Sequence, residues 1–116
     1  MRMANEQWTW PEELDALRAA PEYHTLMMEN DQVRVLNTCV PAGHKVPLHT
    51  HRWPSALFIK SWSDFVRCDE GGNVVADSRS GAAPRAEVAW SGPLGPHTLE
   101  NVGNQDLWVV AVEQKG

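Results

Sequence analysis

From Pro21 onward the chain is a succession of short runs rich in β-branched and aromatic residues, each ended by turn residues. No helical pattern lies between these runs, so a parallel sheet built from β-α-β units is excluded. The pattern predicts an all-β fold, either a small barrel or a two-sheet sandwich. The expected strands are 24–29, 32–40, 46–51, 55–61, 64–68, 74–77, 87–91, 97–102 and 106–113.

One helix is expected before these strands, over residues 11–19. Thr9 and Glu12 have the spacing of a capping box, and Pro11 suits the first helical turn. Pro21 ends the helical pattern, because proline disfavours helical backbone at the residue before it.

The length of 116 residues corresponds to about one domain and allows one real hydrophobic core. We expect residues 1–29, the helix and first strand, to form an N-terminal appendage. Residues 30–116 are expected to form the barrel.

Charge and composition exclude several classes of protein. Ten basic and 15 acidic residues give a formal net charge of −5, without the dense basic block that nucleic-acid binding needs. The longest apolar run, 107–112, is far shorter than the roughly 20 residues of a membrane helix, and the first seven residues lack the apolar segment of a signal peptide. We therefore expect a cytoplasmic protein, with Cys39 and Cys68 reduced.

Three histidines are candidate metal ligands. His49 and His51 lie two residues apart in an expected strand, so their side chains point to the same face. His97 follows a Gly- and Pro-rich turn at the start of a later strand. Three neutral imidazoles suffice for Zn, Fe, Ni or Cu, and a carboxylate-poor site favours these metals over Mg or Ca.

These residues resemble the two sequence motifs of the cupin superfamily. Gly43, five further residues and His49-x-His51 match the start of the first motif, and Pro96-His97-x3-Asn101 matches the end of the second. The resemblance covers roughly residues 30–112 and implies a jelly-roll barrel, or double-stranded β-helix, with a metal inside it.

The sequence departs from the cupin pattern at one ligand. Where the family usually has a glutamate ligand, this chain has Ser55 and Ala56. A divalent ion held by neutral imidazoles alone keeps its +2 charge and attracts anionic or chelating ligands. Some cupin dioxygenases resemble this arrangement, whereas other members of the superfamily hold no metal.

Two functions from different classes follow from the resemblance. The first is a metal-dependent dioxygenase that acts on a small anionic or chelating substrate, with Fe, Zn, Ni, Mn or Cu as its metal. The second is a non-catalytic cupin module that binds or senses a small molecule. Sugar or lyase chemistry ranks below both, because no acid or base for it is evident in the sequence.

The expected pocket wall is mostly aliphatic. Strand alternation places Ser55, Leu57 and Ile59 on one face, and Trp53 is expected near the pocket mouth. The other two histidines, His24 and His44, are expected to be bystanders, the first structural or exposed and the second solvated.

A homodimer is expected on two grounds. Small cupins commonly form dimers, and six tryptophans are many to bury within 116 residues. Trp8 and Trp10 could cover a sheet edge or a partner subunit, while Trp62, Trp90 and Trp108 are expected in the core or an interface.

Overall fold

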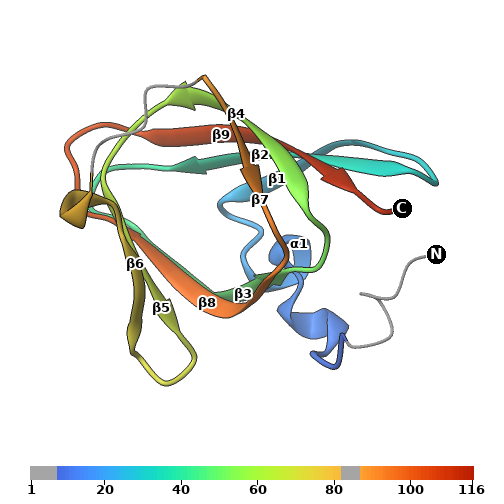
Figure 1. Ribbon diagram of the computed structural model, residues 1–116, viewed down its shortest axis with the longest axis horizontal. Helices are drawn as coiled ribbons and strands as arrows, with labels where there is room; N and C mark the ends of the chain where they lie inside the picture. Colours follow the sequence, from blue (N-terminus) through green and yellow to red (C-terminus); the bar gives the residue numbers. More distant parts are fainter. Residues whose placement is uncertain (1–7, 82–86) are drawn as a thin grey trace.

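The computed structural model describes residues 8–81 and 87–116 (Figure 1). The first seven residues, on which the signal-peptide argument rests, lie outside these ranges. The described strands are β1 (His24–Glu29), β2 (Val33–Val40), β3 (Lys45–His51), β4 (Ser55–Ser61), β5 (Phe65–Asp69), β6 (Val74–Asp77), β7 (Val88–Ser91), β8 (Leu94–Asn101) and β9 (Leu107–Gln114).

The strands form two antiparallel sheets that face each other (Figure 1). The larger sheet has the order β1-β2-β9-β4-β7 and the smaller one the order β3-β8-β5-β6. The all-β prediction is therefore confirmed as a two-sheet jelly roll. β1, which we expected in the appendage, is hydrogen-bonded to β2 within the larger sheet.

The prediction of one continuous helix over residues 11–19 is wrong. A 3-10 turn, η2 (Glu12–Leu14), and a single helical turn, α1 (Ala16–Ala19), are separated by Asp15, whose backbone is extended (φ −54°, ψ 142°). Asp15 forms a bridge with Thr50 of β3, so pairing with the sheet interrupts the helix. The predicted capping box does not form, because Pro11 is the N-cap residue of η2 and no side chain caps this turn.

Strand β8 also begins earlier than expected. The Gly-Pro-rich stretch before His97 was predicted to be a turn, but Leu94 and Gly95 already belong to the strand. Leu94 pairs with His51 across the sheet, so tertiary pairing overrides the local preference of glycine and proline for turns.

Asn101 joins the two halves of the cupin-like pattern. Its buried side chain donates to the carbonyl oxygens of Val40 and Gln105, and its Oδ1 accepts from Ser63 Oγ and the Gly103 amide. The backbone carbonyl of Asn101 also accepts from the amide of Gly43, which has the positive φ (82°) that favours glycine.

The hydrophobic core lies between the two sheets. It consists of Ala20, Val40, Val46 and Leu107, with Tyr23, Trp62, Phe65, Leu99 and Val109 packed around them. Of the three tryptophans expected in the core or an interface, Trp62 packs against this core, whereas Trp90 and Trp108 lie outside it and are 63% and 38% exposed. Cys39 and Cys68 are free thiols in half-buried positions.

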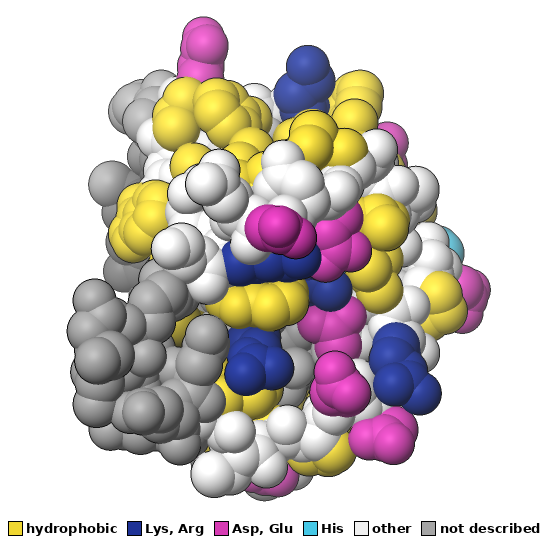
Figure 2. Space-filling model, turned by 90° about the vertical axis from the view of Figure 1, so that its right-hand side faces the viewer, with side chains coloured by type: hydrophobic (Ala, Val, Ile, Leu, Met, Phe, Trp, Pro, Cys, Tyr) yellow, Lys and Arg dark blue, Asp and Glu magenta, His cyan; other side chains and the backbone are white. Residues whose placement is uncertain are grey.

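The surface carries mixed charge on the face shown in Figure 2, where basic and acidic side chains lie next to one another around hydrophobic ones. Among the residues that the structure describes, no helix is both long and apolar enough to pass through a membrane.

We predict that Asn101→Ala lowers the free energy of unfolding by about 2–4 kcal/mol, because several buried groups lose their hydrogen-bond partner together. Urea denaturation measures this change. Gln105→Ala is the matched control, because Gln105 is exposed and contributes only its backbone carbonyl to this network. Equal stability of the two variants would contradict the role assigned to Asn101.

Candidate metal centre

The three predicted histidines lie together between the two sheets. His49 and His51 project from β3, and His97 of β8 is the direct cross-strand neighbour of His49. The ring centroids of His49 and His97 are 4.2 Å apart, and those of His49 and His51 are 5.0 Å apart. All three line one cavity of about 290 Å³.

His24 joins this group, which corrects its assignment as a bystander. It lies on β1 and is only 4% exposed, and its ring centroid is 4.9 Å from that of His49 and 5.3 Å from that of His51. One potential ligand atom from each of His24, His49 and His51 lies within 4.8 Å of the others. No sequence motif marked His24, because β1 lies some 20 residues before the cupin-like pattern and only the sheet brings it to β3.

The Nδ1 atom of every one of these four rings is engaged by a hydrogen bond. The partners are the carbonyl oxygen of Ala20 for His24, of Pro47 for His49 and of Gly95 for His97, and the carboxylate of Glu113 for His51. A carbonyl oxygen only accepts, so Nδ1 must be the donor in the three backbone contacts. Each of these neutral rings therefore carries its free lone pair on Nε2, as a metal ligand requires.

The four imidazoles are neutral near pH 7. Burial, together with the charges of neighbouring rings, lowers the pKa of His24 and His49 to about 4. The same causes lower the pKa of His51 and His97 to about 3. A metal would therefore meet little competition from protons at neutral pH.

This donor set fits a divalent transition metal. Two nitrogens that bind one ion at about 2.1 Å lie at most about 4.2 Å apart, so small ring rotations bring the observed cluster into coordinating range. Imidazole nitrogens suit Zn, Cu, Fe and Ni, and no carboxylate is among the described residues that line the cavity.

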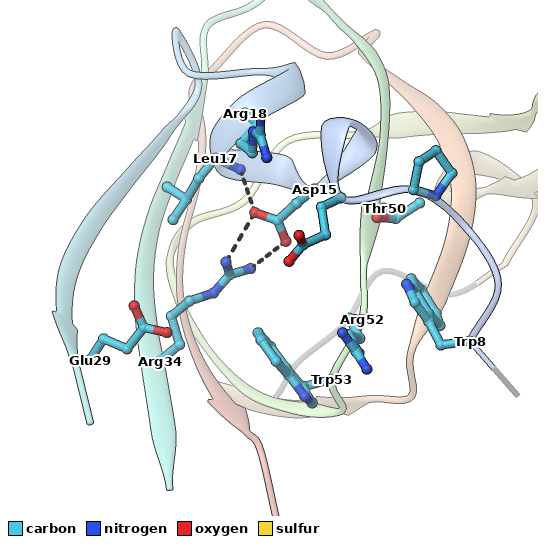
Figure 3. Close-up of a pocket in the computed structure, with 11 residues that line it drawn as sticks. Trp8, Asp15, Leu17, Arg18, Glu29, Arg34, Thr50, Arg52 and Trp53 are labelled. Carbon is cyan, nitrogen blue, oxygen red and sulfur yellow. Dashed lines mark hydrogen bonds and ion pairs between the residues drawn. The ribbon is translucent and has the colours of Figure 1, made fainter. Parts of the chain in front are cut away.

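A buried carboxylate nevertheless lies directly behind the histidines, on β9. Glu113 is 1% exposed and accepts a hydrogen bond from His51 Nδ1 at 3.3 Å. Its other oxygen accepts from Arg34 Nε at 2.6 Å, and the same guanidinium makes two hydrogen bonds to Asp15 (Figure 3). An acidic side chain therefore contacts one of the candidate ligands, although it does not line the cavity itself.

Burial and the contacts among these charged groups together shift their pKa values in different directions. Burial raises the pKa of Glu113, although Arg34 opposes the shift. Burial would also raise the pKa of Asp15, but its hydrogen bonds with Arg34 outweigh this and lower it. The pKa of Arg34 is raised despite burial, because Asp15 and Glu113 both stabilise its charged form.

The expected pocket residues fall into two places. Ser55, Leu57 and Ile59 line the histidine cavity, with further apolar side chains from both sheets. Trp53 lines a separate pocket of about 300 Å³ around Asp15 and Arg34 (Figure 3), so the structure does not place it at the cavity mouth. His44 lies outside the cavity and is exposed, with its Nδ1 3.1 Å from the Tyr23 hydroxyl.

One charged side chain lines the cavity, and the sequence analysis did not identify it. Arg67 lies on β5 opposite Leu99 of β8, and both residues face the histidines' cavity. Strand alternation within residues 65–69 could have indicated an inward arginine, but only the pairing of β5 with β8 shows which face is inward.

Solved structures share this fold at low sequence identity. A cupin domain from Bordetella pertussis aligns with a TM-score of 0.63 at 17% identity, covering 80% of this chain and 92% of that one. A double-stranded β-helix protein from Klebsiella pneumoniae aligns at 0.57 and 15% identity, covering 100% and 90%. The polyketide cyclase RemF from Streptomyces resistomycificus aligns at 0.53 and 15% identity, covering 88% and 72%.

No family model matches the sequence, and no curated protein matches it either. The structural likeness therefore establishes the fold: this chain is a cupin-type double-stranded β-helix with a cluster of histidines inside it.

We predict that Glu113→Gln lowers the free energy of unfolding by about 3 kcal/mol, because the two carboxylate oxygens accept from Arg34 Nε and His51 Nδ1, whereas an amide has one acceptor oxygen and turns a donor toward the other group. Thermal and urea unfolding of the metal-free protein measure the loss. Glu29→Gln is the control, since the Glu29–Lys115 pair is partly exposed and is expected to contribute less than about 1 kcal/mol. A loss no larger than that of the control would contradict the structural role of Glu113.

Proposed function

We propose that this chain is a metal-dependent cupin enzyme, a dioxygenase that acts on a small anionic or chelating substrate. His49, His51 and His97 would hold the metal, and His24 is placed to join them. The observation that carries the proposal is the group of four neutral imidazoles, three buried and His51 half-buried, whose Nδ1 atoms are all engaged, which leaves Nε2 available for a metal.

A divalent ion in this site would supply Lewis acidity and, if it is iron, a place for O2 chemistry. The residues of this chain would do the rest. The carbonyl oxygens of Pro47, Gly95 and Ala20 orient three of the rings, and Glu113 orients His51. The aliphatic wall that includes Leu57 and Ile59 limits water around a bound substrate.

A non-catalytic binding or sensing module is the second candidate. It is favoured by the lining of the cavity, which within residues 8–81 and 87–116 includes no carboxylate that could act as a general base. Tight binding of a small molecule without turnover, in metal-loaded and metal-free protein alike, would support this function over the first.

We predict that metal-free protein binds one equivalent of Zn²⁺ or Ni²⁺, and that His49→Ala weakens binding by at least a hundredfold. His49 is the centre of the cluster, so its loss removes a ligand common to every metal arrangement. Isothermal titration calorimetry and metal analysis measure the affinity and the number of bound ions. O2 uptake by the iron-loaded protein is then measured with thiols, 2-oxo acids and β-diketones as substrates.

His44→Ala is the control for the metal titration, because His44 is an exposed histidine outside the cavity. Metal binding at the same strength in wild type, His49→Ala and His44→Ala would exclude the site. Metal binding without O2 uptake on any of these compounds would favour the binding module.

We also propose that the chain forms a homodimer through the outer face of its larger sheet. The strand register aligns Met28, Val35, Val112, Ala56 and Trp90 as successive neighbours across all five strands. Such a continuous apolar row on an exposed sheet face is typical of a surface that another chain covers.

We predict that size-exclusion chromatography with light scattering gives a dimer mass, and that Trp90→Glu gives a monomer. A charge at Trp90, the β7 end of the apolar row, makes burial of the row unfavourable. Val75→Glu is the matched control, because Val75 is equally apolar and 56% exposed but lies on β6 of the other sheet. A monomeric wild type, or a dimer that survives Trp90→Glu, would contradict this interface.

A further inference from the structure

Arg67 holds an unusual position for an arginine. It projects from β5 into the histidine cavity and is half-buried, and it also borders a shallower outer pocket that includes His97 and Trp10. Its guanidinium thus lies between the histidines and the outside of the barrel. A ligand that entered from the outer pocket would meet this group.

The guanidinium of Arg67 has no protein partner among residues 8–81 and 87–116. No hydrogen bond or ion pair links it to any described side chain, whereas the buried Arg34 has both Asp15 and Glu113. Asp69 and Glu70 border the same outer pocket, but Asp69 accepts hydrogen bonds from Gly71 and Asn73 in its own turn. Arg67 is therefore a charge without a neighbour that neutralises it.

Burial of the Arg67 guanidinium lowers its pKa. A guanidinium stays protonated under such conditions, so its charge persists. Keeping an unpaired charge in an apolar cavity is costly, and a bound anion would remove that cost.

The rest of the cavity defines what such an anion can look like. Among its described lining residues, Arg67 alone carries a formal charge at neutral pH, and the remaining polar side-chain groups are neutral imidazoles, the Trp62 indole N–H and the hydroxyls of Thr38, Ser55 and Ser91. Most other lining side chains are aliphatic or aromatic. The volume of about 290 Å³ is at the lower end of the usual range for small-molecule sites.

We propose that Arg67 is the specificity-determining residue of this cavity, and that the substrate is a small monocarboxylate with an apolar body. The planar guanidinium matches a carboxylate with two parallel hydrogen bonds. One cation balances one carboxylate, so a phosphate or a second charged end away from the histidines would remain unpaired. The proposal deepens the proposed function, because the end of the substrate opposite the carboxylate would face the histidines.

The test uses hexanoate and hexanamide, which have the same shape but differ in charge. Metal-free protein is titrated with each and followed by the NMR signal of the Trp62 indole, since Trp62 lines the cavity. We expect hexanoate to bind at least tenfold more tightly than hexanamide, and Arg67→Gln to abolish this preference. Arg79→Gln is the matched control, because Arg79 is an exposed arginine paired with Asp77 outside the cavity.

Equal binding of hexanoate and hexanamide by the wild-type protein, or no binding of hexanoate to metal-free and zinc-loaded protein, would overturn the proposal. This comparison needs no variant, so it decides the question even if Arg67→Gln does not fold. Arg67→Lys, which keeps the charge, is expected to retain a preference for the carboxylate.

Metal titration of the same variants separates this inference from the proposed function. If Arg67→Gln binds Zn²⁺ like the wild type and loses only the carboxylate preference, both hold. If neither the wild type nor any variant binds metal, but the wild type prefers hexanoate and Arg67→Gln does not, the metal function fails and the recognition role of Arg67 stands.

Discussion

The structure depends on one buried guanidinium, that of Arg34. It is held between Asp15, which interrupts the N-terminal helical segment, and Glu113 on the last strand. Both carboxylates are stabilised by the one guanidinium in a largely buried region, so removing Arg34 would leave two carboxylates without a cation. This interaction ties the start of the chain, β2 and β9 together, and through Glu113 it reaches His51.

The same interaction explains the charge of the candidate metal centre. Glu113 is the carboxylate nearest the histidines, but one of its oxygens is committed to Arg34 and the other to His51 Nδ1. It therefore orients a ligand rather than serving as one, and the described lining of the cavity contains the neutral imidazoles and one cation, that of Arg67. An ion in such a site would retain its full positive charge and favour anionic ligands.

Local patterns predicted much of the fold. The bounds of β1, β4 and β6 agree with the sequence expectation, because alternating runs bounded by turn residues leave little choice of conformation. The N-terminal helix and the start of β8 did not follow local preference. Asp15 pairs with Thr50, and Leu94 pairs with His51, and in both cases contacts with distant strands outweighed propensity.

The sequence by itself determined the all-β class and the placement of His49 and His51 on one face, since side chains two residues apart in a strand point the same way. It also marked His97 through its resemblance to the cupin pattern. Only the tertiary structure brought in His24, Glu113 and Arg67, which come from β1, β9 and β5. Their roles depend on which strands pair and which face is buried, and no local pattern encodes the spatial meeting of residues so far apart along the chain.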